Sequence, residues 1–446
     1  MSLFGLEDAN VRAVVLGSML LGAGAGVLGC FTLLRKRALL GDALAHAALP
    51  GVCLAFLFTQ SKHPLVLLAG AALTGGLGVW AVNAIVRHSR IKEDSALALT
   101  LSVFFGAGIV LLTRIQKSGA AAQAGLDRFL FGQAASLVQA DVWLLGGVTV
   151  LLLAGVTLAF KEFKLLTFDA PFAASLGWPV GRLELLLGAL IVLSVTVGLQ
   201  LVGVVLMAAM LITPAAAARF WTDRLPRMLG IAAVIGALSG ALGAYVSMLA
   251  PRMPTGPWAV IAATFGFTVS LLVAPRRGLV ARFARHWDTR RRTAEENALK
   301  TFYKLGEGDE DWRRPHGAEE LARRRHLTPR AAERTLARLE RSGWIARADG
   351  GWSLTGPGLD RARRMVRLHR LWEVYLAERL NLAADHVHED AEHIEHVLTP
   401  ELEAELEAIL ARPEYDPHRR PIPYDPAPGA AGPEAGGARA AGEAPA

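Results

Sequence analysis

The sequence predicts an all-α membrane protein with about nine transmembrane helices, followed by a charged half of a different kind. Hydrophobic residues make up 52% of the 446 residues, and residues 1–275 contain apolar runs long enough to cross a bilayer. These 275 residues carry 18 Lys and Arg and 11 Asp and Glu, whereas residues 276–446 carry 29 and 29. This composition excludes a wholly soluble protein and a disordered one.

Nine apolar segments are each close to the ~20 residues that a spanning helix needs. They lie at 11–34, 38–58, 65–86, 96–115, 141–160, 183–199, 201–218, 228–250 and 257–274. The run from Leu183 to Arg219 has two interpretations, because it could form one long helix or two spans that meet near Gln200. The positions of the basic residues favour two spans.

Basic residues between the spans also predict the orientation of the chain in the membrane. With two spans in the 183–219 run, all basic clusters fall on the same side of the bilayer. These clusters are at 35–37, 87–92, 161–164, 219–227 and 276–277. Because basic loops of membrane proteins face the cytoplasm, we expect the N-terminus outside and residues 276–446 in the cytoplasm.

One pair of ionisable residues opens the second predicted span. Asp42 and His46 are four residues apart, so both side chains lie on one helix face. Ionisable groups at membrane depth are costly and usually line a pathway or a cavity, and a carboxylate beside an imidazole suits a divalent cation such as Mn²⁺, Fe²⁺ or Zn²⁺. Alternatively, Asp42 caps the helix end and His46 bonds a backbone carbonyl, and the residues alone do not separate these interpretations.

The segment that contains this pair, residues 41–51, reads GDALAHAALPG. It resembles the signature of the permease subunits of manganese, zinc and iron ABC importers. Further matches to these permeases lie at 93–94, 125–132, 161–177, 202–219 and 254–256. The resemblance covers essentially residues 10–278.

This resemblance implies a permease dimer, of two identical or two different subunits, in the inner (plasma) membrane of a bacterium. Two ATPase subunits would dock on its cytoplasmic side, and a metal-binding solute-binding protein would deliver the ion. Asp42 and His46 would then form a transient metal site or gate, and Phe168, Asp169 and Gly177 would belong to a cytoplasmic coupling loop; a polar connector is the alternative for this loop. No Gly-Lys dipeptide occurs, so the chain has no Walker phosphate loop and is not expected to be an enzyme.

The charged half opens with a basic linker, which we expect to contact lipid headgroups. Helical spacing follows at 295–305 and 317–325, and Thr328 can cap a third helix over 329–341. Two short strands, 344–348 and 352–355, flank an Asp-Gly-Gly sequence that is typical of a hairpin. Helix, helix, turn, helix and a two-stranded wing form a winged helix-turn-helix.

The third helix of this module carries the candidate DNA-binding residues. They are Thr328, Arg330, Arg334, Thr335 and Arg338. Residues 276–375 carry a net charge of +10, which favours contact with phosphates and base edges. A solvated face of a protein-interaction module is the alternative, and the net charge of −10 over residues 376–446 weakens a long-range field.

Six further residues form a candidate divalent-metal site after the wing. They are His369, Glu373, His388, Glu392, Glu395 and His396. The first two are four residues apart on one helix, and the other four share a face of a second helix. Imidazole and carboxylate ligands together suit Mn²⁺ or Fe²⁺, although a solvated acidic surface is the alternative.

Residues 294–424 resemble the iron- and manganese-dependent repressors of the diphtheria-toxin-repressor family, and the resemblance includes Pro421-Ile-Pro423. It implies that the six candidates are metal ligands. The first helix of that family donates ligands too, at positions occupied here by Asn297 and Lys300. Asn is a weak ligand and protonated Lys is none, so this part of the site departs from the family and metal-gated repression stays open.

The predicted organisation has five parts. They are a permease domain (1–278), a basic linker (279–293), a winged helix-turn-helix (294–358), a helical metal-binding and dimerisation domain (359–425) and a disordered tail (426–446). Two functions remain open for the charged half. It could be a metal-responsive DNA-binding regulator, or a metal sensor that acts on the transporter without DNA.

Overall fold

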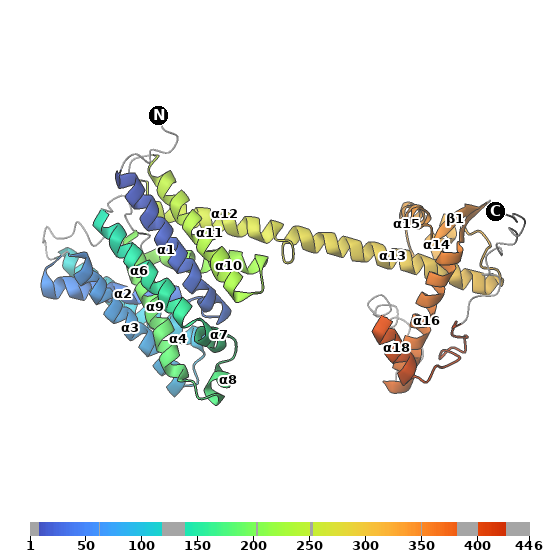
Figure 1. Ribbon diagram of the computed structural model, residues 1–446, viewed down its shortest axis with the longest axis horizontal. Helices are drawn as coiled ribbons and strands as arrows, with labels where there is room; N and C mark the ends of the chain where they lie inside the picture. The colour runs from blue at the N-terminus through green and yellow to red at the C-terminus, as the bar shows by residue number, and fades with distance from the viewer. Residues whose placement is uncertain are drawn as a thin grey trace, which may run out of the picture. The chain divides into compact units, whose positions relative to one another are not determined.

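The computed structural model describes residues 9–61, 63–117, 139–201, 204–249, 253–348, 350–380 and 400–424. The chain divides into two compact units, Met1–Arg282 and Phe283–Ala446. The first unit is a bundle of long apolar helices, and the second combines shorter helices with a two-stranded sheet (Figure 1).

Within the part of the chain that the structure describes, nine long helices correspond to the nine predicted spans. They are α1 (Ala9–Leu34), α2 (Leu40–Thr59), α3 (Pro64–His88), α4 (Glu93–Lys117), α6 (Gln139–Leu158), α9 (Val180–Leu201), α10 (Val204–Trp221), α11 (Leu225–Ser247) and α12 (Thr255–Val273). Eight of them are long and apolar enough to cross a membrane; the exception is α10, whose fully described part, Met207–Trp221, is shorter. The run from 183 to 219 forms two helices, as the basic clusters predict.

Small residues bring α1 and α11 into backbone contact. A Cβ atom placed on Gly22 would lie 2.1 Å from the carbonyl oxygen of Gly236, and one on Gly26 would lie 2.4 Å from that of Ala232. Helices in a bilayer gain little from the hydrophobic effect, so close packing of small residues holds them together. The two helices run side by side in Figure 1.

Helix α2, which carries Asp42 and His46, packs against α3, α4 and α10. Most of its residues between Leu40 and Phe56 are buried, and Pro50 lies inside the helix without ending it. The first turn of α2 contains Asp42, where a negative charge interacts favourably with the helix dipole. The bundle therefore holds the candidate pair on a fixed central element.

The segment 161–177, expected to be a loop, forms two short helices instead. They are α7 (Phe160–Phe168) and α8 (Ala170–Ser175). Helix α7 is amphipathic, because Phe163 and Leu166 are buried while Lys161 and Lys164 are exposed. The apolar pattern in this short stretch outweighs its polar composition.

The second unit has the element order of a winged helix-turn-helix. Its elements are α13 (Leu279–Asp309), α14 (Ala318–Arg324), α15 (Pro329–Arg341), β1 (Ile345–Ala348), β2 (Gly351–Leu354), α16 (Gly356–Arg379) and α18 (Pro400–Ile409). The strands pair antiparallel, with Ile345 opposite Leu354. Leu299, Phe302, Leu336 and Val366 form part of the buried core of this unit.

The basic linker expected at 279–293 is helical and continuous with the first helix of the winged module. The sequence predicts a helix from residue 295, whereas α13 begins at Leu279. No Gly or Pro occurs between Leu279 and Leu305, and the Ala, Arg and Leu residues in this stretch favour helix. The linker is therefore the N-terminal part of the first helix of the winged module.

Candidate functional site

Asp42 and His46 lie together on α2. Oδ1 of Asp42 is 3.4 Å from Nε2 of His46, and 33% and 16% of the two side chains are exposed. The ring of His46 packs edge-on against Phe105 of α4, with ring centroids 4.7 Å apart. Among the described residues, the buried Nδ1 of His46 has no hydrogen-bond partner.

This geometry fits a transient cation site. Oδ1 of Asp42 and Nε2 of His46 are close enough to bind one cation together. Buried polar atoms are nearly always hydrogen-bonded, and Nδ1 on the other side of the ring has no such partner among the described residues. Oxygen and nitrogen donors of this kind accept borderline divalent ions. The alternative in which His46 bonds a backbone carbonyl finds no support, since the structure gives neither ring nitrogen a carbonyl partner within its described part.

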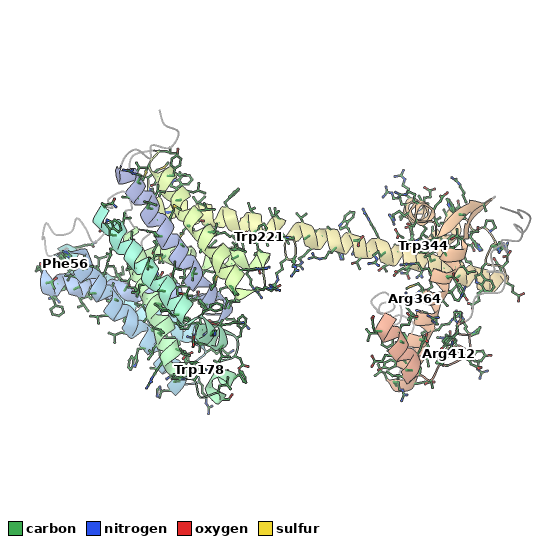
Figure 2. The ribbon with its side chains drawn as sticks, viewed as in Figure 1. Phe56, Trp178, Trp221, Trp344, Arg364 and Arg412 are labelled. Atoms are coloured by element: carbon green, nitrogen blue, oxygen red, sulfur yellow. The ribbon has the colours of Figure 1, made fainter. Side chains whose placement is uncertain are left out.

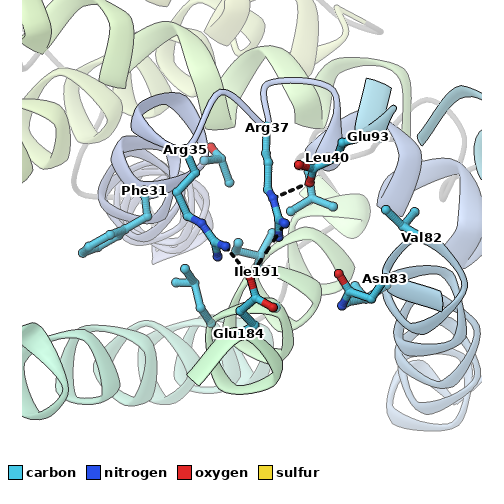
Figure 3. Close-up of a pocket in the computed structure, with 13 residues that line it drawn as sticks. Phe31, Arg35, Arg37, Leu40, Val82, Asn83, Glu93, Glu184 and Ile191 are labelled. Atoms are coloured by element: carbon cyan, nitrogen blue, oxygen red, sulfur yellow. Dashed lines mark hydrogen bonds and ion pairs between the residues drawn. The ribbon is translucent and has the colours of Figure 1, made fainter. Parts of the chain in front are cut away.

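A cluster of ion pairs surrounds the start of α2 (Figure 3). Arg35 and Arg37, in the turn between α1 and α2, both reach Glu184 of α9, at 2.5 and 3.8 Å. Arg37 also pairs with Glu93 of α4, and Arg87 of α3 lies 3.4 Å from Glu184. Except for Arg87, these side chains line a cavity of about 20 Å³, large enough for about one water molecule.

The sequence analysis missed Glu184, although one signal was available. Glu184 is the only charged residue between Leu183 and Ala218, and a lone carboxylate in such a run needs a partner. Its three arginine neighbours come from segments 97 or more residues away in the chain. Only the fold could show which cations it meets.

The three predicted coupling residues occupy distinct places. Phe168 ends α7 and is exposed. Asp169 caps α8, because its Oδ1 accepts a hydrogen bond of 2.9 Å from the backbone N–H of Phe172. Gly177 has a φ of +81°, a backbone conformation that favours glycine.

The α7–α8 segment has one buried and one exposed apolar side. On the buried side, Phe163 packs against Phe31 of α1, with ring centroids 5.8 Å apart. On the exposed side lie Phe172, Leu176 and Trp178, the last of which is labelled in Figure 2. An exposed apolar patch in a polar connecting segment is typical of a protein-interaction surface.

The candidate DNA-binding residues divide into two groups. Thr328 caps α15, and Arg330 and Arg334 are exposed. Thr335 is buried and donates a hydrogen bond to the carbonyl of Ala331, while Arg338 pairs with Glu295 of α13 at 2.8 Å. The second group thus contributes to the internal structure of the unit.

Of the six candidate ligands in the second unit, the structure describes His369 and Glu373. Nε2 of His369 is 3.1 Å from Oε1 of Glu373, with 2% and 4% of the side chains exposed. The other four, at 388, 392, 395 and 396, lie outside the described residues. Ligand atoms of Glu373, Asp416 and His418 lie within 4.8 Å of one another, a proximity that the sequence analysis did not anticipate.

Helix α13 carries Asn297 and Lys300 at the two positions where the sequence departs from the ligands of the repressor family. Lys300 is 1% exposed, and Oδ1 of Asn297 accepts a hydrogen bond of 3.2 Å from Arg325. Burial and the charge of Lys300 lower the pKa of Lys304 to about 8, against the opposing effect of Glu373. Because fixed cations repel a metal ion, the α13 side of this site does not fit one.

Comparison with known proteins identifies the membrane unit. Residues 7–274 match the model of the ABC 3 transport family. The chain belongs to this family. Within this ABC 3 unit, the matched residues include the Asp42–His46 pair, the ion-pair cluster around Glu184 and the α7–α8 segment.

Two curated relatives and one solved structure extend this result. MntC of Bacillus subtilis, a manganese transport system membrane protein, is 44% identical over 422 residues, which are 94% of this chain and 96% of the relative. TroC of Treponema pallidum, a zinc transport system membrane protein, is 44% identical over 274 residues, 61% of this chain and 92% of the relative. PsaBC from Streptococcus pneumoniae in complex with Fab matches with a TM-score of 0.55 and 31% identity, covering 61% of this chain and 95% of that one.

The charged half matches a second family model. Residues 355–424 match the iron dependent repressor, metal binding and dimerisation domain. The match to the Bacillus subtilis relative continues through this half, whereas the match to the Treponema pallidum relative covers only the length of the ABC 3 unit. The chain thus joins an ABC 3 unit to a repressor-like unit.

Proposed function

We propose that this chain is the permease subunit of an ABC importer for divalent metal ions, with Asp42 and His46 as a transient site for the ion. The carrying observation is the geometry of His46: its Nε2 lies 3.4 Å from Oδ1 of Asp42, and its buried Nδ1 has no partner among the described residues. Two curated relatives support this substrate class, because one is named as a manganese and the other as a zinc transport system membrane protein.

The α7–α8 segment is the proposed docking surface for a separate ATPase subunit. Its exposed Phe168, Phe172 and Trp178 offer apolar area for a partner, and Asp169 holds α8 in shape by capping it. Helix α9 follows this segment directly and carries Glu184, which contacts both arginines of the turn before α2. These contacts connect the proposed docking surface to the turn before α2, the helix that carries Asp42 and His46.

The proposal includes the other parts that the resemblance to metal ABC importers implies. A solute-binding protein delivers the ion from outside, and a second permease, identical or related, encloses the path. The basic clusters at the ends of the helices support an orientation in the bacterial inner membrane with residues 276–446 in the cytoplasm.

Metal uptake tests this proposal. In cells that depend on the importer, His46→Gln and Asp42→Asn should each reduce the initial rate of Mn²⁺ or Zn²⁺ uptake at least about 10-fold, which corresponds to about 1.4 kcal/mol. His88→Gln is the matched control, because His88 is exposed at the end of α3 and bonds the carbonyl of Ala84. Unchanged uptake in both variants, at equal amounts of protein in the membrane, would reject the role of the pair.

For the repressor-like unit we propose a regulatory role in which α15 contacts DNA. Thr328, Arg330 and Arg334 support this role, because they are exposed on one helix of a winged module. Phosphate contacts make binding steeply dependent on salt. A metal sensor that acts on the transporter without DNA is the other candidate.

A mobility-shift assay with the full chain in lipid nanodiscs separates these roles. We expect the full chain to bind the DNA upstream of its own gene at low salt. The double variant Arg330→Gln/Arg334→Gln should bind this DNA at least about 10-fold more weakly, which is the loss expected from removing two contacts. Arg419→Gln is the control, since it removes an exposed arginine outside the winged module. Absence of binding at low salt, with and without Mn²⁺, would reject the DNA role.

A further inference from the structure

The first two turns of α13 carry an apolar stripe that the structure leaves uncovered. Val280, Phe283 and Trp287 are 62%, 63% and 62% exposed. Their spacings of three and four residues place them on one face of the helix. This stripe, formed by the three residues, follows the end of α12 by only a few residues, since Val273 and Leu279 are separated by five positions.

Large apolar side chains are rarely exposed in the charged half of the chain. Many large apolar side chains of the spanning helices are exposed as well, and a bilayer accounts for them. In the described residues after 275, by contrast, only Leu380, Leu402, Ile409 and Tyr415 are large apolar side chains exposed to a similar degree outside the stripe. Three such residues within eight positions therefore indicate a binding surface.

Positive charge covers the other faces of the same turns. Arg282, Arg285 and Arg292 lie away from the stripe, and Arg290 and Arg291 border it. Between Leu279 and Ala294 the only acidic residue is Asp288. A helix with one apolar face and a strongly basic polar face binds at the interface of anionic membranes.

We propose that the stripe inserts into the surface of an anionic bilayer, with the arginines on phosphate headgroups. Three observations favour lipid over a protein partner. First, the last spanning helix ends at Val273, seven positions before Val280, so the stripe begins near the membrane surface. Second, the positive charge of this part of α13 complements anionic lipid. Third, the stripe contains Trp287, and Trp favours the interface of bilayers. The inference holds for any ion that the ABC 3 unit carries.

The proposal has a structural consequence for the repressor-like unit. Helix α13 is continuous to Asp309, and its later residues Ala298, Leu299 and Phe302 belong to the core of the winged module. A stripe that lies in the interface therefore holds the first helix of this module at the membrane surface. Only DNA that comes to the membrane could then reach α15.

Fluorescence quenching of a polarity-sensitive label tests the proposal in the full chain. Phe283→Cys and Trp287→Cys place the label on the stripe, and Thr289→Cys places it on the opposite, exposed face as the matched control. Both native cysteines, Cys30 and Cys53, are buried, and labelling of the unmodified chain measures their contribution. The labelled chain is reconstituted in vesicles of phosphatidylcholine, with and without phosphatidylglycerol.

With phosphatidylglycerol present, we expect the labels at 283 and 287 to be quenched by spin-labelled lipid and to be at least threefold less accessible to aqueous iodide than the label at 289. High salt should reduce this difference. Equal iodide accessibility at all three positions would overturn the proposal. Protection that follows the protein-to-lipid ratio instead of the lipid composition would also overturn it, and would assign the stripe to a second copy of the chain.

Discussion

Two histidine–carboxylate pairs in this protein share a sequence spacing and differ in their surroundings. The Asp42–His46 pair on α2 is partly open, and one ring nitrogen has no partner among the described residues. The His369–Glu373 pair on α16 is almost fully buried, and Lys304 interacts with its carboxylate. Spacing of four residues puts two ligands on one face, but access and neighbouring charge decide whether a cation can bind there.

The difference also concerns what each pair contributes to its unit. Near α2, the cations Arg35 and Arg37 pair with Glu184 and Glu93, and no ion pair of either arginine with Asp42 occurs among the described residues. Near α16, Lys300 is buried and Lys304 is half-buried, and the charges of Lys304 and Glu373 interact. Fixed cations on α13 thus occupy the side from which the repressor family provides ligands.

The largest expected effect comes from breaking the ion-pair cluster beside α2. Glu184→Gln leaves the mostly buried Arg35 without its carboxylate, and breaking a buried ion pair costs about 3–5 kcal/mol. We expect a clear fall in the thermal unfolding temperature of the full chain in detergent. Asp223→Asn is the control, because Asp223 is half exposed and its loss should cost at most about 1 kcal/mol. Equal effects of the two variants would show that the cluster does not stabilise the region around α2.

A second substitution should allow the buried His369–Glu373 pair to bind a cation, as we propose for the Asp42–His46 pair. Lys300→Glu replaces a cation by a carboxylate, and we expect the affinity of the repressor-like unit for Mn²⁺ to rise about 10-fold or more, about 1.4 kcal/mol. Titration calorimetry on the full chain measures this affinity. The chain also carries His46→Gln, so that the proposed metal site on α2 does not contribute. Lys300→Gln, which removes the charge without adding a ligand, should have a smaller effect. Weaker binding in Lys300→Glu than in the parent chain would contradict this view of α13.

A smaller effect is expected at the α7–α8 segment, the proposed docking surface for the ATPase. Asp169→Ala removes the cap of the six-residue α8, at a cost of about 1 kcal/mol. Uptake per ATP hydrolysed should fall about fivefold, the factor that corresponds to this energy. Asp169→Ser keeps a capping oxygen and should restore most of the coupling. Full coupling in Asp169→Ala would show that the shape of α8 is not needed.

The smallest effect concerns pH and the buried pair. Burial lowers the pKa of Lys304 to about 8 from its ordinary value of 10.5. Between these values the unfolded chain binds more protons than the folded one, so the free energy of unfolding should rise as pH increases above about 8. Denaturant unfolding at pH 7, 8 and 9 measures this slope, and Lys304→Met should abolish it. A fall in stability over this range would contradict the lowered pKa.

Periodicity and charge predicted much of the architecture. The spans, the division of the 183–219 run, the capped third helix and the hairpin all rest on local signals, such as apolar run length, basic clusters, Thr328 before Pro329, and Gly350. Two local features were misjudged. The 161–177 segment is helical because Phe163 and Leu166 bury one face against α1, and the basic linker is helical because α13 continues through it.

The sequence by itself determined which residues could bind a metal, because the i, i+4 spacing and the ligand types are local properties of the chain. Tertiary structure decided which of them are available. Glu184 meets arginines from distant segments, Thr335 and Arg338 turn toward the inside of the second unit, and Lys300 is buried. These outcomes depend on contacts between residues far apart in sequence, where burial and neighbouring charge set the electrostatic energy of each group, and no local pattern specifies them.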